Sequence, residues 1–177
     1  MARDRREHRN PVRQTRPATS ATRRTWYGLG KLSRAEKSGF GRFLHDCSHI
    51  FGDISILALP TLFAIVAAPG PGIYDATAAG LLAWTAMVLV GTLIRGGWIR
   101  PLGTDTLGWV AISPLLVVLR LVYYNLALSV AVFGSVWIAG AVGVPALSLV
   151  AALVVAVASM LAFPRVAESV YETVRGR

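Results

Sequence analysis

The residues best equipped for chemistry lie together in one short segment. Residues 45–49 read His-Asp-Cys-Ser-His, and Asp53 follows four residues after His49. On a helix, His45, His49 and Asp53 stand at i, i+4 and i+8, so they share one face. Two imidazoles one turn apart can bind a divalent metal, and a carboxylate on the next turn can be a third ligand or can orient a ring. The spacing therefore raises the hypothesis of a metal site, and a divalent ion is the one cofactor that this pattern suggests.

The same three residues also have a structural interpretation, which we favour. Residues 26–53 mix aromatic and aliphatic side chains with Lys and Arg, as expected of an amphipathic juxtamembrane segment. His and Asp side chains in such a segment reach toward the polar layer of the membrane. The sequence contains no HExxH motif, no paired CxxC and no phosphate-binding glycine loop that would specify an activity.

Arg120 is the second residue with functional potential. A guanidinium inside a bilayer is costly and usually finds a partner, a cavity or a lipid phosphate. If a membrane span begins at Leu121, Arg120 is an interfacial anchor, and this is the interpretation we favour. The alternative is a functional charge inside the membrane, with Asp53 or Asp105 as its partner.

The elements that would position these residues are predicted to be membrane helices. Hydrophobic residues make up 54% of the 177 residues and charged residues only 15%, which is too apolar for an ordinary soluble domain. Between residues 54 and 163 the charged side chains are Arg95, Arg100, Arg120, Asp75 and Asp105. The long uncharged runs between them predict an all-α integral membrane protein with a bundle of four transmembrane helices.

The four spans are predicted at about 54–68, 76–94, 121–142 and 146–163. Pro60 predicts a kink inside the first span. Residues 107–119, with Pro114 among them, are expected to form a re-entrant or in-plane segment, because 107–143 is too long for one span. The rival interpretation divides this stretch into two short spans that meet near Tyr124 and Asn125.

Both termini are expected in the cytoplasm, because the segments predicted outside, 69–75 and roughly 140–145, contain no Lys or Arg. Twelve of the 18 Lys and Arg lie in residues 1–46, against four of the nine Asp and Glu. Residues 1–25 have almost nothing to bury and are expected to form a disordered basic tail. Residues 164–177 are expected to form a short cytoplasmic carboxyl-terminal tail.

Small residues recur at every fourth position of the last two predicted spans. They are Ala127, Ala131, Ser135, Ala139 and Gly143 in one, and Ser148, Ala152 and Ala156 in the other. Such ridges allow helices to approach closely in lipid. They indicate either packing within one bundle, which we favour, or the contact surface of a homo-oligomer.

These features favour a non-enzymatic accessory or scaffold subunit of the cell membrane, one that associates with itself or with another membrane protein. Its basic tail would lie on anionic lipid head groups, since each Lys or Arg near such a surface contributes about 1 kcal/mol. Nucleic acid is not an expected partner, because no stacking or groove-reading motif is present. The alternatives are a metal-dependent membrane enzyme or metal carrier using His45, His49 and Asp53, and a small oligomeric channel or transporter.

Overall fold

The computed structural model describes residues 39–68, 75–104 and 114–175, and every regular element in these ranges is helical. The elements are α3 (Gly39–Leu57), α4 (Leu59–Ala67), α5 (Ala76–Gly96), α6 (Pro114–Ser129), the π-helical turn η3 (Val130–Gly134), α7 (Ser135–Val142) and α8 (Leu147–Arg175). The all-helical prediction is therefore confirmed for this part of the chain. The predicted tail at 1–25, the first part of the juxtamembrane segment and Asp105 lie outside the described residues.

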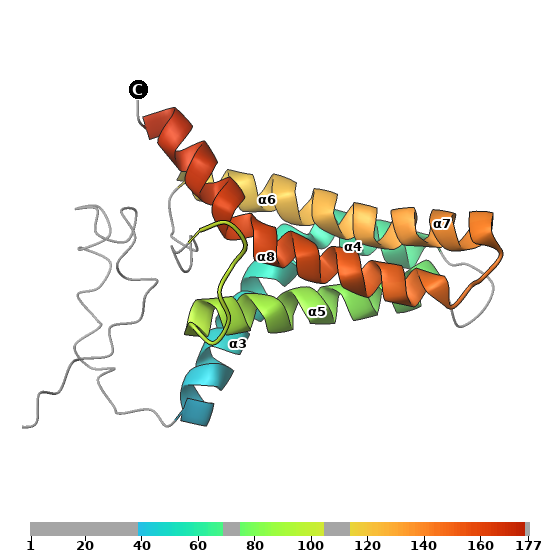
Figure 1. Cartoon of the computed structure of the whole chain (residues 1–177), viewed down its shortest axis with the longest axis horizontal. Helices are drawn as coiled ribbons and strands as arrows, with labels where there is room; N and C mark the ends of the chain where they lie inside the picture. The colour runs from blue at the N-terminus through green and yellow to red at the C-terminus, as the bar shows by residue number, and fades with distance from the viewer. Residues whose placement is uncertain (1–38, 69–74, 105–113, 176–177) are drawn as a thin grey trace, which may run out of the picture.

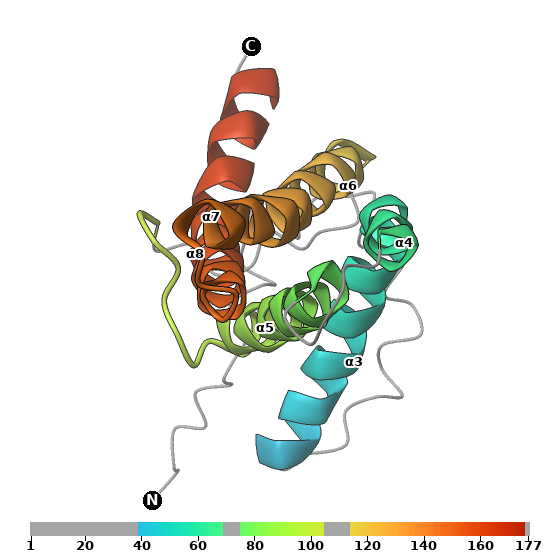
Figure 2. The same ribbon diagram turned by 90° about the vertical axis from the view of Figure 1, so that its right-hand side faces the viewer.

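Four segments, namely α4, α5, the continuous α6–α7 helix and α8, run side by side along the long axis of the molecule, each opposite in direction to the one before it, whereas α3 lies obliquely to them (Figure 1). Viewed end-on, α5, α8, the α6–α7 helix and α4 surround a common core (Figure 2). The start of α3, the end of α5, the start of α6 and the end of α8 lie at one end of the bundle. The fold therefore collects the segments around His45, Arg95 and Arg120 at the same end.

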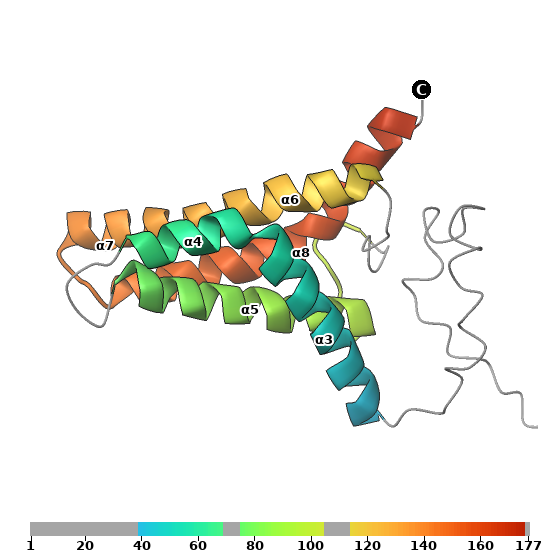
Figure 3. The ribbon, with the colours of Figure 1, turned by 180° about the vertical axis from the view of Figure 1, so that it is seen from behind.

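Three helical segments are long and apolar enough to cross a membrane, namely Ala76–Gly96, Pro114–Val142 and Leu147–Val174. The pair Phe43–Leu57 and Leu59–Ala67 passes the same test together, but the two helices meet at a bend of 67°. Figure 3 shows this bend between α3 and α4 from behind. The kink expected from Pro60 is thus present, and the helix is interrupted at Ala58, two residues before the proline.

No helix boundary lies at Arg120, where the sequence predicted a new element to begin. Helix α6 begins at Pro114 and continues through Arg120 and the π-helical turn into α7, so 114–119 belongs to the same helix as 121–142. Proline is tolerated in the first turn of a helix, where its missing N–H has no intrahelical partner to lose. Of the expected re-entrant segment, 107–113 lies outside the described residues.

The last helix extends past the predicted end of the last span at Phe163, because α8 continues through Pro164 to Arg175. A proline inside a helix removes one hydrogen bond and bends the chain. The final turns of α8 accordingly point away from the bundle (Figure 1). The segment after α5 lies against this region, where the Leu102 N–H donates to the Leu161 carbonyl at 2.9 Å. Residues 164–175 of the expected carboxyl-terminal tail are therefore helical.

The ridges of small residues face the core. In α6–α7 and α8 the small residues at four-residue intervals are buried, from Ala127 to Ala139 and from Ser148 to Ala156. Gly143 differs, since it is exposed and ends α7 in the left-handed conformation at φ 75°. Facing α8, helix α5 presents a buried row of its own that includes Ala79, Ala83 and Gly91. Packing within one chain thus accounts for the ridges.

A larger side chain on this surface should destabilise the bundle. Ala156 is fully buried, so Ala156→Leu adds volume to a filled space and should lower the free energy of unfolding by about 1–3 kcal/mol. Val154, which is 60% exposed on the same helix, provides the control Val154→Leu, expected to stay within about 0.5 kcal/mol of wild type. Denaturation of the purified protein in detergent measures both. Equal stability of the two variants would contradict this packing.

Candidate functional site

A buried ion pair joins α3 to α6. Arg120 is 2% exposed, and its guanidinium Nη1 donates to Asp53 Oδ1 at 2.5 Å. Its Nε donates to the Leu116 carbonyl one turn earlier at 3.1 Å. The fully buried Tyr124 adds a long hydroxyl contact of 3.4 Å to Asp53 Oδ2. Asp53 is one of the two partners considered for Arg120 from the sequence, and the burial of Arg120 argues against an anchor in the lipid head-group layer.

A second set of polar contacts fills the break between α3 and α4. In an unbroken helix the Thr61 N–H would donate to the Leu57 carbonyl. Here the side-chain amide of Asn125 lies between them, with Nδ2 donating to the Leu57 carbonyl at 2.7 Å and Oδ1 accepting from the Thr61 N–H at 3.1 Å. Asn125 of α6 therefore replaces the backbone hydrogen bond that the bend removes.

The hydroxyl groups of Thr61 and Ser129 extend this arrangement. Thr61 Oγ1 donates to Asn125 Oδ1 at 2.8 Å and lies 3.3 Å from Ser129 Oγ. We call Asp53, Arg120, Tyr124, Asn125, Thr61 and Ser129 the polar column. Arg120, Tyr124, Asn125 and Ser129 all come from α6, so a single helix supplies the partners for both halves of the bent element. The one formal positive charge of the column is matched by its one negative charge.

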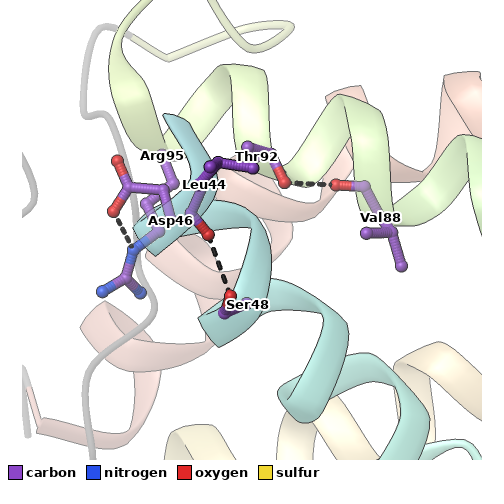
Figure 4. Close-up of polar contacts among 6 residues, drawn as sticks. All are labelled: Leu44, Asp46, Ser48, Val88, Thr92 and Arg95. Carbon is purple, nitrogen blue, oxygen red and sulfur yellow. Dashed lines mark hydrogen bonds and ion pairs between the residues drawn. The ribbon is translucent and has the colours of Figure 1, made fainter. Parts of the chain in front are cut away.

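A second ion pair fixes α3 to α5. Arg95 Nε donates to Asp46 Oδ1 at 3.0 Å, and both side chains are largely buried, with exposed fractions of 18% and 9%. Figure 4 shows this pair beside Thr92, whose hydroxyl donates to the Val88 carbonyl. The acidic residues of α3 are thus each bonded to a different neighbouring helix, which orients α3 about its own axis.

The predicted metal-binding residues are only partly brought together. The rings of His45 and His49 are in edge-to-face contact with centroids 4.5 Å apart, as their i, i+4 spacing implies. Asp53, the third candidate ligand, is bonded to Arg120 instead. Within the described residues, no group of three His, Cys, Asp or Glu side chains is arranged to hold a metal. Metal binding by His45, His49 and Asp53 therefore stays a prediction.

Asn125 and Thr61 are the residues that sequence reasoning missed. The available signal was a proline within an apolar span, which implies backbone groups in need of partners, together with an asparagine in another apolar span. Pairing the two requires knowing that α4 and α6 are neighbours, and no local spacing contains that information.

The fold and the site define an all-helical protein with three helices of membrane-spanning length and a buried ion pair between α3 and α6. The chain belongs to the family described as Domain of unknown function (DUF8215), whose model matches residues 37–170. No curated protein and no solved structure matches the chain.

The ion pair should behave as a coupled unit. Arg120→Met leaves the Asp53 carboxylate without its buried partner and should lower the free energy of unfolding by about 2 kcal/mol or more. Adding Asp53→Leu should recover part of this loss, because no charge is then left unpaired. The control is Arg165→Gln, since the side chain of Arg165 is 60% exposed in its pair with Glu168 and should contribute within about 0.5 kcal/mol. Additive effects of the two core substitutions would contradict the coupling.

Proposed function

We propose that this chain is an integral membrane protein that crosses the bilayer four times and acts as a non-enzymatic accessory or scaffold subunit. The observation that carries the proposal is the distribution of large apolar side chains over the outer surface. Among them are Phe63 (69% exposed), Leu81 (63%), Trp137 (74%) and Val154 (60%), one from each of the four antiparallel segments. A soluble monomer rarely exposes apolar side chains around its whole circumference, whereas lipid or a partner helix would cover them.

The bent α3–α4 element is the first crossing in this proposal. Its break would be tolerated at membrane depth because Asn125 and Thr61 provide partners inside the protein. The guanidinium of Arg120, whose side chain is 3% exposed, is likewise shielded inside the protein and paired with Asp53, as intramembrane charges require. The polar column is therefore compatible with a bilayer around it.

The orientation follows from the basic residues. Arg95 lies in the last turn of α5, and Arg100 and Arg165 belong to or contact the segment that follows α5, at the end of the bundle where α3 begins, whereas 140–146, at the opposite end, has no Lys or Arg. This asymmetry favours placing the first end, together with both termini, in the cytoplasm. The basic residues 1–25 would then lie beside the anionic leaflet and hold the cytoplasmic face against it.

An accessory role is supported by the structural task of the polar side chains, which hold helices together. The described members of the polar column bond to one another and thereby position helices, and the small-residue ridges are covered within the chain. The outward aromatic and aliphatic side chains remain as the surface for a partner membrane protein or a second copy. Self-association, where it occurs, would use these larger side chains instead of the small ridges.

Cysteine accessibility tests the membrane topology. In a Cys47→Ser background, Val144→Cys should react with a membrane-impermeant maleimide on intact cells, whereas Leu102→Cys should react only after permeabilisation. Both positions are exposed on the protein, 50% for Val144 and 55% for Leu102, so burial does not separate them. Labelling of both positions from the same side, or recovery of the protein in the soluble fraction, would overturn the proposal.

A further inference from the structure

A shallow cavity, widely open to the surroundings, lies along one exposed face of α3, beside the ion pair. Its volume is about 340 Å³, and the described residues that line it are Ser48, His49, Gly52, Asp53, Ile56 and Leu57. These residues recur at intervals of one helical turn and extend over about 13 Å at 1.5 Å per residue. The lining changes along the helix from hydroxyl, imidazole and carboxylate groups to two aliphatic side chains. The cavity therefore offers a polar end and an apolar end to the same ligand.

The polar end presents hydrogen-bond acceptors. The Ser48 hydroxyl donates its hydrogen to the Leu44 carbonyl at 2.9 Å, so its oxygen has only lone pairs left to offer (Figure 4). Asp53 Oδ1 accepts from Arg120, whereas Oδ2 has only the long contact with Tyr124 at 3.4 Å. Because the Asp53 side chain is 20% exposed, part of this carboxylate is accessible. A ligand that donates hydrogen bonds would fit these two acceptors, which lie in the lining together with the His49 imidazole.

The charges beside the cavity favour a cationic ligand over an anionic one. Among the side chains that the structure describes, the arginine bonded to this face is Arg120, whose side chain is only 3% exposed and pairs with Asp53. An anionic group entering the cavity would meet the accessible carboxylate before it met the guanidinium. An ammonium group has three N–H donors and would match the accessible carboxylate through a charge-assisted hydrogen bond.

We propose that this cavity binds the primary ammonium head group of a membrane phospholipid of the ethanolamine type, with an acyl chain along Ile56 and Leu57. The inference rests on the proposed membrane location. The long apolar run of the chain begins at Ile54, so the acceptors of Ser48 and Asp53 lie at the transition from polar to apolar sequence. This is the depth at which a lipid changes from head group to acyl chain.

Gly52 provides a variant that fills the cavity without disturbing the core. It lies in the lining, and a Cβ added there has no atom within 4 Å. Leucine also has a higher helix propensity than glycine, so Gly52→Leu should fold. Gly140 is a matched control, because it is a helical glycine whose added Cβ likewise meets nothing within 4 Å, and it lies outside this cavity in α7.

The test measures lipid binding to the full-length protein in detergent. Dioleoyl phosphatidylethanolamine and dioleoyl phosphatidylcholine are added in equal amounts, and bound lipid is counted by native mass spectrometry. Wild type and Gly140→Leu should prefer the ethanolamine lipid by about 10-fold, since a choline head group has no N–H and loses a charge-assisted hydrogen bond. Gly52→Leu should abolish most of this preference.

Equal binding of the two lipids to wild type would overturn the proposal, and so would a preference that survives in Gly52→Leu. If dioleoyl phosphatidylglycerol bound wild type more tightly than the ethanolamine lipid, and Gly52→Leu lost this binding, the cavity would be an anion site and the proposal would be overturned. Each of these outcomes can occur in a protein that passes the cysteine-accessibility test. Failure of the lipid site is therefore distinguishable from failure of the proposed topology.

Discussion

The arrangement of this protein depends on satisfying the backbone groups at one helix break. Between α3 and α4 the chain bends by 67°, and the Thr61 N–H and Leu57 carbonyl no longer reach each other. A buried backbone group without a partner costs about 1–3 kcal/mol, and more in lipid. The Asn125 amide can satisfy both groups at once, because its Nδ2 donates to the Leu57 carbonyl while its Oδ1 accepts from the Thr61 N–H. This requirement places α6 against the bend and sets its register.

The remaining polar contacts follow from that register. Arg120 lies five residues before Asn125 and therefore stands near the end of α3, where Asp53 neutralises it. Tyr124 adds its hydroxyl to the same carboxylate, and Thr61 and Ser129 continue the contacts along α4. On the other side of the bundle α5 and α8 pack through small residues and need no such pairing. The molecule thus combines a polar interface around the bent element with a close-packed apolar interface.

Sequence reasoning reached the parts that depend on local pattern. The 76–94 segment lies within α5, the ridge from Ser148 to Ala156 faces the core, and the break occurs next to Pro60. Sequence reasoning failed where the course of a helix or the partner of a side chain depends on residues far away in the sequence. Arg120 looked like the boundary of a span, because an isolated charge normally ends one, whereas the helix continues through Arg120 and Asp53 of α3 pairs with it.

The distinction between local pattern and distant partners also applies to Pro164 and to the candidate site. Proline is a stop signal in sequence, yet α8 continues beyond it, with the segment after α5 bonded to the neighbouring turn. The one-face placement of His45 and His49 could be derived from their spacing alone. The engagement of Asp53 by Arg120 could be suggested from the sequence but not established, since nothing local fixes which helix lies beside α3.

The most direct test of this account is a distance measurement across the bend. Spin labels at Leu44 of α3 and Val66 of α4, both exposed, report the angle between the two helices in a Cys47→Ser protein reconstituted in bilayers. If the Asn125 amide fixes the bend, the distance distribution should be single and narrow in wild type and in Ser129→Ala, and should broaden or shift in Asn125→Leu. A distribution that is unchanged in Asn125→Leu would contradict the central role assigned to Asn125.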